Sequence, residues 1–357
     1  MRTVDQILRE ATLQKSPTDA EPARALDRFS RKRHVELVRS LSRVSAVRST
    51  LYIAVQWIVM IGAIVVAAKV NHWAVYLVSM IVLASRMQAL GVLMHDGAHY
   101  LLYKNRVLND VVSDLFVAFP IGMSTTLYRK THFRHHRYTN TEEDQDLAAQ
   151  QEEQEWFEWP KTRLGLFVTL IRSVFGINFL RGWILYKHWA PWNNFRSPDF
   201  PPRCRVLYVL STACVYSFFA IALKIDPRTT ILLVVIYMLA GITVLNLINR
   251  IRATAEHLGT RGDHELNDTR TVLPNFVERL LIAPYGVNYH LEHHLFPSVP
   301  GYRLSELHRE LMKDEEFRAK AHITQGYTGV IQELMDLQVQ ANEEKENEEK
   351  AKEISAV

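Results

Sequence analysis

Four long runs of apolar residues divide the chain, and each is long enough to cross a bilayer. A membrane-spanning helix needs about 20 residues, and the runs that meet this length are Leu51–Val70, Ala74–Met94, Val206–Ile225 and Thr230–Leu247. The first run follows a long polar segment and lacks a small-residue cleavage site, which excludes a signal peptide. The pattern therefore predicts one multi-pass membrane unit rather than two soluble domains.

The links between these runs predict two helical hairpins. Asn71–Trp73 and Asp226–Thr229 are so short that each pair of runs must turn back on itself. Basic residues gather before the first run, as at Arg31–Arg33, and before the third, at Arg203 and Arg205. By the positive-inside rule, both termini and the long middle segment are expected on the cytoplasmic side.

The remaining segments predict an all-α protein. Apolar residues recur at helical spacing within residues 1–50, which predicts cytoplasmic helices there, and a C-terminal cytoplasmic helix is expected over residues 312–340. Leu164–Leu185 is apolar but interrupted by charged residues and glycine, which favours a position in the membrane interface. Residues 341–357 are expected to form a disordered charged tail.

Charge and cysteine content exclude some classes of function. Lys and Arg total 42 against 38 for Asp and Glu, and a net charge of +4 does not predict a nucleic-acid partner. Cys204 and Cys214 are the two cysteines, so neither a disulfide framework nor a cysteine-based zinc site is indicated. Histidine, with 15 copies, is the informative residue.

Three short histidine clusters lie at the ends of the apolar runs. "HDGAH" spaces its histidines i, i+4, and "HFRHH" and "HLEHH" space theirs i, i+3, i+4, so each set lies on one side of a helix. The clustered residues are His95, His99, His132, His135, His136, His290, His293 and His294. The isolated histidines are expected to be ordinary structural residues: His34, His72, His188, His264, His308 and His322.

The clustered imidazoles predict a metal centre. Packed together without metal, they would leave buried nitrogens unsatisfied or accumulate repelling charges. Eight nitrogen ligands exceed the capacity of one ion, so at least two metal ions are expected, and ligand type alone leaves iron, copper, zinc and nickel open. The H-E-x-x-H signature of zinc proteases is absent, and the apolar runs lack the ionisable row of a metal transporter. A non-catalytic histidine-rich metal-binding membrane protein remains an alternative.

The order of these clusters resembles the membrane fatty acid desaturase and hydroxylase superfamily. A hairpin followed by H-x-x-x-H, then H-x-x-H-H, a second hairpin and a last H-x-x-H-H extend over residues 51–311. The segments "MHDGAHY", "HHRYTNTEEDQDL" and "PYGVNYHLEHHLFPSVPGYRLSELH" look most like bacterial acyl-lipid desaturases. The resemblance implies four transmembrane helices beneath a helical cytoplasmic cap that carries a di-iron site, in the inner membrane of a bacterium.

The same resemblance implies a dioxygen-dependent desaturase. Two iron ions would activate dioxygen, and a double bond would form in a fatty acyl chain linked to a lipid, CoA or ACP. The chain has no H-P-G-G segment of a fused cytochrome b5 domain and no cysteine-rich ferredoxin element. Electrons are therefore expected from an external donor such as ferredoxin or cytochrome b5. The same histidines also serve hydroxylases and ketolases, so such an enzyme acting on a carotenoid, sterol-like, alkane or other lipid substrate is the alternative.

The resemblance also assigns ligands residue by residue. The eight clustered histidines match the box positions of the family and are implied to bind iron. Stearoyl-CoA desaturases have a further histidine after the last span, four residues after an asparagine that holds a water molecule. His257 matches this ninth ligand, whereas Ala253 occupies the position of the asparagine.

Several polar residues beside the ligands are candidates to orient the imidazoles. These are Asp96, Glu256, Asn288 and Glu292. On a continued helix, however, Glu256 is expected to point away from the metal and to matter less than His257. Asp144 and Asp146 are expected either to pair with Arg134 and Arg137 or to be solvated.

Overall fold

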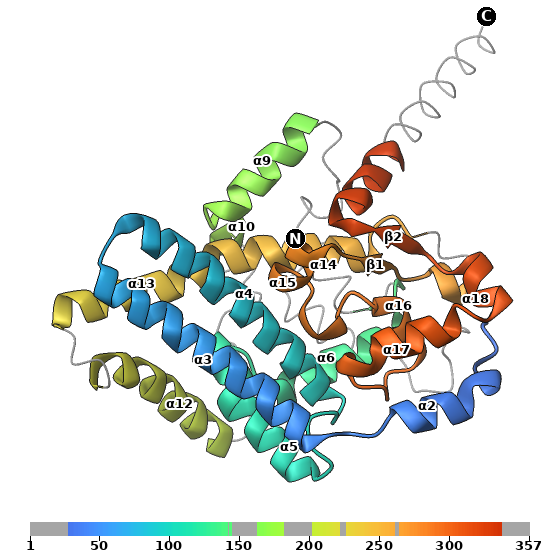
Figure 1. Cartoon of the computed structure of the whole chain (residues 1–357), viewed down its shortest axis with the longest axis horizontal. Coiled ribbons are helices and arrows are strands. Elements are labelled where there is room, and N and C mark those ends of the chain that lie inside the picture. The colour runs from blue at the N-terminus through green and yellow to red at the C-terminus, as the bar shows by residue number, and fades with distance from the viewer. Residues whose placement is uncertain are drawn as a thin grey trace, which may run out of the picture.

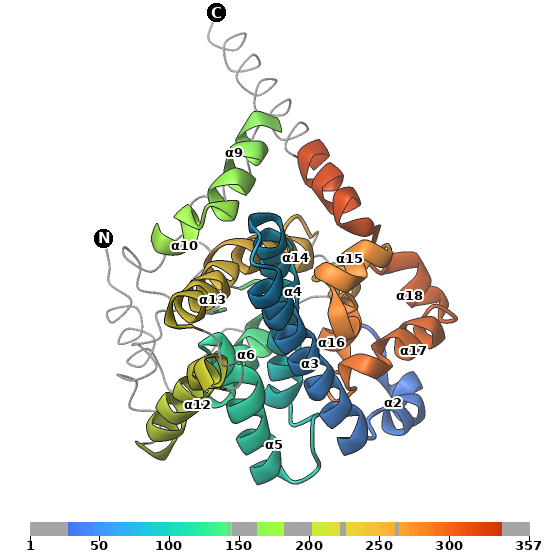
Figure 2. The ribbon, with the colours of Figure 1, turned by 60° about the vertical axis from the view of Figure 1, so that its left-hand side comes forward.

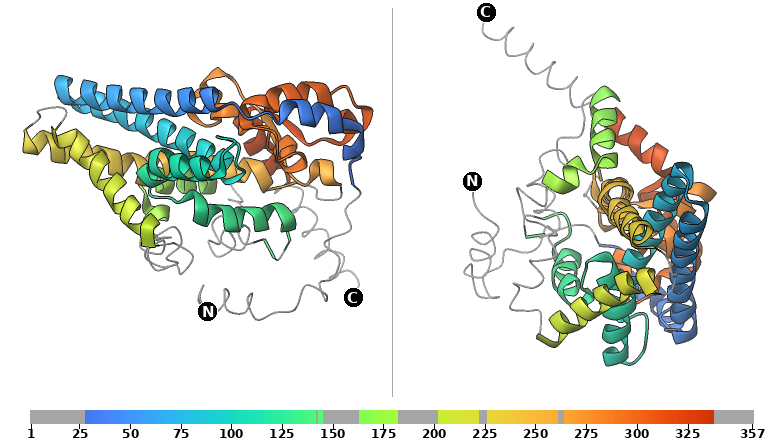
Figure 3. Two further views of the ribbon diagram at one scale, coloured as in Figure 1. Left: turned by 90° about the horizontal axis from the view of Figure 1, so that it is seen from below. Right: turned by 90° about the vertical axis from the view of Figure 1, so that its left-hand side faces the viewer.

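Long helices form one end of the molecule, and shorter helices with two strands form the other (Figures 1 and 3). The computed structural model describes residues 28–141, 143–144, 163–181, 202–221, 226–260 and 264–337. The long helical end contains α3 (Ala46–Val70), α4 (Trp73–Ala98), α12 (Pro202–Ile221), α13 (Pro227–Ala240), the π-helical turn η5 (Gly241–Leu245) and α14 (Asn246–His257).

Two further groups of elements complete the described chain. Between α4 and α12 lie α5 (Arg106–Ser113), the π-helical turn η2 (Asp114–Ala118), η3 (Phe119–Ile121), α6 (Thr125–Tyr138), α9 (Arg163–Val174) and α10 (Ile177–Arg181). The cap, defined as residues 28–45 and 264–337, contains η1 (Arg31–His34), α2 (Val35–Leu41), η6 (Glu265–Asn267), β1 (Thr271–Leu273), α15 (Phe276–Leu281), η7 (Pro284–Gly286), α16 (His290–Leu295), α17 (Gly301–Leu311), α18 (Glu315–Lys320), β2 (Ile323–Gln325) and a helix at residues 326–337.

α3 and α4 pack along each other because the chain turns sharply between them. Ser45 caps the start of α3, where its hydroxyl accepts a hydrogen bond from the Arg48 N–H. Asn71 follows the last residue of α3, and its φ of 49° is left-handed, a conformation that Asn adopts more readily than most residues. The His72 side chain then caps α4 by accepting a hydrogen bond from the Ala74 N–H.

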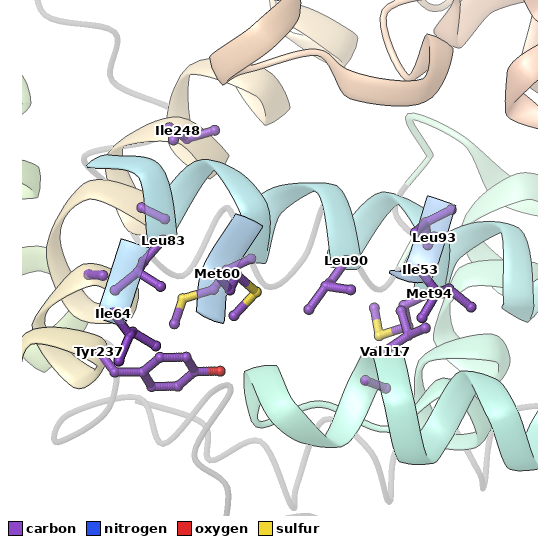
Figure 4. Close-up of a cluster of buried hydrophobic side chains, with 14 of the residues drawn as sticks. Ile53, Met60, Ile64, Leu83, Leu90, Leu93, Met94, Val117, Tyr237 and Ile248 are labelled. Carbon is purple, nitrogen blue, oxygen red and sulfur yellow. The ribbon is translucent and has the colours of Figure 1, made fainter. Parts of the chain in front are cut away.

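α3, α4 and α13 lie side by side (Figure 2), and the faces where they meet form a large buried cluster (Figure 4). Met60, Leu90 and Leu233 are almost fully buried within it. The outward faces are apolar as well, with exposed fractions of 68% at Ile58 and 65% at Ile231. Helices that are apolar on both their buried and their exposed faces are typical of membrane spans.

The described chain has three helical segments that are long and apolar enough to cross a membrane: Ala46–Val70, Trp73–Ala98 and Pro227–His257. The last of these contains the predicted run Thr230–Leu247 and continues beyond it to the end of α14. The predicted run Val206–Ile225 coincides largely with α12, and residues 222–225 lie outside the described part of the chain. The count of four spans therefore stays a prediction.

The segment that follows α4 bends sharply before α6. Residues Arg106–Ile121 and Thr125–Tyr138 meet at 91°, the geometry of a broken span or a re-entrant loop. Gly122, with a φ of 78°, lies at this bend. Ser124 then caps α6 by accepting a hydrogen bond from the Leu127 N–H. The bend directs α6 towards α4, against which it packs.

α9 and α10 occupy most of the predicted interfacial segment Leu164–Leu185. Gly176, with a φ of 69°, separates them and packs so closely on η5 that an added Cβ would lie 2.7 Å from Ile242 Cγ2. Leu164 and Phe167 of α9 have exposed fractions of 70% and 60%. This exposed apolar surface is compatible with an interfacial position, which stays a prediction.

The cap has a hydrophobic core of its own. Leu291 of α16, Leu307 of α17 and Phe317 of α18 are fully buried in it. Phe29 and Leu41 of the N-terminal segment join the same cluster. The segment of residues 29–41 is therefore packed in one unit with residues from the segment 266–323.

The described chain is mostly helical, as expected, with one short parallel pair formed by β1 and β2, in which Val272 lies opposite Thr324. The expectation of one helix over residues 312–340 is wrong, since α18, β2 and the helix at 326–337 follow one another there. β2 exists because it finds a strand partner far earlier in the chain, and such pairing depends on context more than on local propensity. The tail expected at residues 341–357 lies outside the described residues.

Candidate metal centre

α4 presents His95 and His99 at its C-terminal end. The last carbonyls of a helix have no partner within the helix. Here the Arg129 guanidinium donates to the carbonyl oxygens of Ala98 at 2.7 Å and Gly97 at 3.1 Å. These bonds hold the last turn of α4 and therefore the two imidazoles that flank it.

α6 carries three histidines that point in two directions. At 3.6 residues per turn, His132 and His136 lie about 40° apart around the helix, and His135 lies about 60° to the other side of His132. His132 and His135 are buried, whereas His136 is partly buried. One helix can therefore contribute to two neighbouring sites.

α14 and α16 supply four more imidazoles. His257 is the last residue of α14, and its Nε2 lies 2.8 Å from Nε2 of His290 at the start of α16. His294, one turn further along α16, has its Nε2 3.0 Å from the same nitrogen of His290. On the same short helix, Nε2 of His293 lies 2.9 Å from Nε2 of His136. The predicted ninth histidine thus lies among the box histidines.

The nine imidazoles form two adjacent clusters, and within each the potential ligand atoms lie within 4.8 Å of one another. The rings of His136 and His294 stack at 4.3 Å between centroids where the clusters meet. The five-histidine cluster consists of His95, His99, His132, His136 and His293, and the four-histidine cluster consists of His135, His257, His290 and His294.

The nitrogens could serve as metal ligands, and they do not form a complete hydrogen-bonded network. Nε2 of His132 lies 2.8 Å from Nε2 of His99 and 3.0 Å from Nε2 of His136. In a neutral imidazole each ring nitrogen is either a donor or an acceptor, so a single nitrogen does not hydrogen-bond well to both of these neighbours. Nε2 of His95 is buried with no hydrogen-bond partner among the described residues, which is costly. A cation in each cluster would accept all these lone pairs, so the donor sets fit a metal that binds imidazole, iron included.

Burial keeps the imidazoles of four of these residues neutral, as metal binding requires, namely His99, His290, His293 and His294. It lowers the pKa of His290, His293 and His294 well below the ordinary value of 6.5, and neighbouring histidines lower it further because a second positive charge would be repelled. Burial is the main cause that lowers the pKa of His99 to about 4, and the positive charge of Arg129 is the second cause. Protons therefore do not compete for these nitrogens near neutral pH.

Asp144 orients a histidine of the four-histidine cluster. Nδ1 of His135 lies 2.9 Å from Asp144 Oδ2, and the carboxylate is 1% exposed, so the expectation of a solvated Asp144 is wrong. The Arg134 side chain donates to the Glu143 carbonyl instead of extending to this carboxylate. The loop turns Asp144 inward because Asn140 adopts a left-handed conformation and donates its N–H to the same oxygen.

Tyr128 and Thr139 also contact ring nitrogens, and neither residue is among those predicted from the sequence. The Tyr128 hydroxyl lies 3.1 Å from Nδ1 of His132, and the Thr139 hydroxyl lies 3.3 Å from Nδ1 of His294. The spacing of four residues between Tyr128 and His132 was a usable signal, because such residues are neighbours on a helix. The contact of Thr139 depends on how α6 meets α16 and leaves no local signal. Asp146 lies outside the described residues.

Two of the four predicted neighbours lie near ring nitrogens. Oδ1 of Asp96 is 3.8 Å from Nδ1 of His95, and Oε1 of Glu256 is 3.9 Å from Nδ1 of His290. Glu256 is buried beside the centre, so the expectation that it points away is wrong. The end of α14 packs against β1 of the cap, and this packing leaves Glu256 only 7% exposed.

The other two neighbours support the backbone around the clusters. The Asn288 side chain donates to the Val272 carbonyl, and the Val272 N–H donates to the Asn288 carbonyl. Glu292 is fully buried and accepts hydrogen bonds from the Thr271 hydroxyl and from Nδ1 of His308. These contacts hold the loop before α16 and α16 itself against β1 and α17.

The isolated histidines have structural roles in the described chain. His72 caps α4, His264 caps η6, and His34 contacts Asp314. Among the residues that the structure describes, neither these three histidines nor His308 and His322 belong to a histidine cluster. His188 lies outside the described residues.

A family model described as fatty acid desaturase matches residues 71–326, a range that includes all nine clustered histidines. Dihydrorhizobitoxine desaturase of Bradyrhizobium elkanii is 27% identical over 80% of this chain and 81% of its own length. The chloroplastic omega-6 fatty acid desaturase of Arabidopsis thaliana is 26% identical over 62% of this chain and 49% of the relative. The sn-1 oleoyl-lipid 12-desaturase of Synechocystis sp. is 29% identical over 62% of this chain and 63% of the relative.

Proposed function

The chain belongs to the fatty acid desaturase family and is an oxidoreductase of that class, and we propose that it uses two iron ions and dioxygen to introduce a double bond into a fatty acyl chain. The observation that carries the proposal is the convergence of nine imidazoles from α4, α6, α14 and α16 on two adjacent clusters. The all-nitrogen donor sets and the buried position suit a pair of iron ions.

The task of the protein's own residues is to hold and orient the metal-binding nitrogens and to exclude water. Iron bound in the clusters would supply dioxygen activation and hydrogen removal from an unactivated methylene. Two adjacent methylenes lose one hydrogen each, while one dioxygen, two external electrons and two protons are consumed and two waters form. The five-histidine and four-histidine clusters would each hold one ion. Asp144 and Tyr128 fix the orientation of His135 and His132.

The protein is a membrane protein, and we infer that it has four spans with the metal centre on the cytoplasmic face. α4 and α14 both end at the metal centre, and the segment Pro227–His257 is about 46 Å long at 1.5 Å per residue. α6 also lies at the centre, so the chain must return to the far end before Pro227. α12 lies in this stretch and packs against α13, which supports it as the returning span. The basic residues before α3 favour the cytoplasm for the cap, and a bacterial inner membrane suits the resemblance.

The proposed substrate is an acyl chain carried by a lipid, CoA or ACP. Two of the three relatives above are named for fatty acid or oleoyl-lipid substrates, which favours this class, whereas the third is named for dihydrorhizobitoxine. The electrons would come from a separate redox protein such as ferredoxin or cytochrome b5. Hydroxylation of a lipid by the same centre is the alternative outcome.

Lipid analysis after expression in a bacterium that lacks desaturases tests the proposal. We expect a new unsaturated acyl chain with the wild-type protein and about two irons per purified chain, one for each cluster. His293→Ala should abolish the product and lower the iron content. The control is His72→Asn, which keeps the capping acceptor of α4 and should change neither. A hydroxylated lipid would favour the alternative, and His293→Ala protein with full iron would contradict the ligand role.

A further inference from the structure

Arg270 is a charged residue that is completely buried outside both histidine clusters. Its side chain is 0% exposed. Burying a guanidinium is costly unless ion pairs and hydrogen bonds compensate for the lost water. Its partners therefore indicate what this residue does.

Arg270 closes the C-terminal end of α14. Its Nη1 donates to the Ala255 carbonyl at 2.8 Å, and its backbone N–H donates to the Glu256 carbonyl at 3.0 Å. Both carbonyls belong to the last turn, where a helix cannot satisfy them itself. A positive charge at this end also interacts favourably with the helix dipole. The residue that follows these two carbonyls is His257.

The C-terminal segment of the cap holds Arg270 in place. Nε of Arg270 lies 3.3 Å from Oε2 of Glu333 and 3.2 Å from Nε2 of His322. The Thr324 hydroxyl donates to the other oxygen of Glu333 at 2.7 Å, so the carboxylate is itself fixed. Glu333 belongs to the helix at residues 326–337, and it lies beyond residue 326, where the match to the family model ends.

Packing brings the same helix against the end of α14. Gly259 has a φ of 68°, and an added Cβ there would lie 2.5 Å from Cδ2 of Leu334 and 3.1 Å from Cδ1 of Leu337. In Figures 1 and 2, this helix is the unlabelled red one that follows β2. The end of α14 is therefore held by packing as well as by the Arg270 contacts.

We propose that Arg270 is a positioning residue for the four-histidine cluster: anchored by Glu333, it fixes the last turn of α14 and with it the imidazole of His257. The inference rests on the proposed metal centre. It adds that a segment beyond the family match determines the position of one ligand.

Glu333→Gln tests the anchor, because it removes the charge that compensates Arg270 while it keeps the shape of the side chain. Glu310→Gln is the matched control, since Glu310 also pairs with a basic residue, Lys313, and its side chain is 37% exposed, as is that of Glu333. We expect Glu333→Gln to weaken iron binding in the four-histidine cluster about 10-fold or more, so that iron falls from about two towards about one per chain.

The spectrum distinguishes this effect from general damage. Loss of one ion should replace the signature of a spin-coupled pair with the EPR signal of isolated ferric iron, whereas Glu310→Gln should match the wild type. Unchanged iron content and spectrum in Glu333→Gln would overturn the positioning role. Wild-type protein that binds no iron would instead overturn the proposed metal centre, so the two failures can be told apart.

Hydrogen exchange of the iron-free protein gives a second measurement. The Leu258 N–H donates to the Thr254 carbonyl at 3.1 Å and reports on the last turn of α14. We expect this amide to exchange about tenfold faster in Glu333→Gln, because hydrogen bonds to charged groups stabilise more than neutral ones. The amide of Met312, at the end of α17, serves as the internal reference. Equal exchange at Leu258, or the same increase at Met312, would overturn the inference.

Discussion

Asp144 is a single side chain whose loss we expect to weaken metal binding while the fold remains. Its carboxylate accepts the Nδ1 proton of His135, which leaves the lone pair of Nε2 directed into the four-histidine cluster. Asp144→Asn keeps the size but makes the acceptor weaker. We expect the iron affinity of that cluster to fall about 10- to 100-fold, with product formation falling in parallel. Titration of the iron-free protein with ferrous iron measures the change.

Asp314→Asn is the matched control for this substitution. Asp314 also contacts a histidine nitrogen, Nε2 of His34, at 3.2 Å, and its side chain is 8% exposed, but neither residue belongs to a cluster. Asn can still cap α18, so the cap should stay intact. Iron affinity should be unchanged in this control. An Asp144→Asn protein with wild-type affinity would show that His135 is oriented without its carboxylate partner.

At the scale of secondary-structure elements, α4 and α5 approach each other so closely that the last turn of α4 requires glycine. An added Cβ on Gly97 would lie 2.2 Å from Oγ and 2.9 Å from Cβ of Ser113. Gly97→Ala should therefore push the elements apart, at a cost of about 1–3 kcal/mol in unfolding free energy. Since His95 and His99 flank this position, iron content should fall as well. Thermal unfolding in detergent and iron analysis measure the two effects.

The corresponding change in α3 is the control, because nothing lies within 4 Å of a Cβ added to Gly62. Gly62→Ala should leave stability unchanged or raise it slightly, since Ala favours helix over Gly. Adding Ser113→Gly to Gly97→Ala should recover part of the lost stability. If the double substitution recovers nothing, the contact with Ser113 is not the cause of the loss.

The molecule as a whole is expected to place its cap on one side of the membrane and the tips of its long helices on the other. Arg39 and Lys313 are exposed in the cap, and His72 and Arg228 are exposed where the long helices begin. In a protein lacking its native cysteines, an impermeant thiol reagent should label Arg39→Cys and Lys313→Cys from the cytoplasmic face alone. It should label His72→Cys and Arg228→Cys from the opposite face alone.

Arg228 is the decisive position for the topology because it follows α12. If Arg228→Cys were labelled from the same face as Lys313→Cys, α12 would not cross the membrane as inferred. The protein with Cys204→Ser and Cys214→Ser and no added cysteine is the control for background labelling.

Local features of the chain were sufficient to find eight of the nine histidines that converge and the helices that are long and apolar enough to span a membrane, whereas the ninth, His257, was predicted from the family resemblance. Helical spacing brings His132 and His136 to one side of α6 whatever surrounds them, and the apolar content of α3 follows directly from its residues. Such properties depend on neighbours within a few positions. They can therefore be read before any packing is known.

Contacts between distant segments decided the rest. The nine imidazoles divide into clusters of five and four, which separates His135 from His132 on α6 and His293 from His294 on α16. This division depends on the directions in which α4, α6, α14 and α16 pack, because these directions determine which rings meet. The burial of Asp144 against His135 and the pairing of β2 with β1 likewise join segments that no periodicity connects. Only the packed molecule brings these groups within bonding distance, since hydrogen bonds and metal coordination act over a few ångströms.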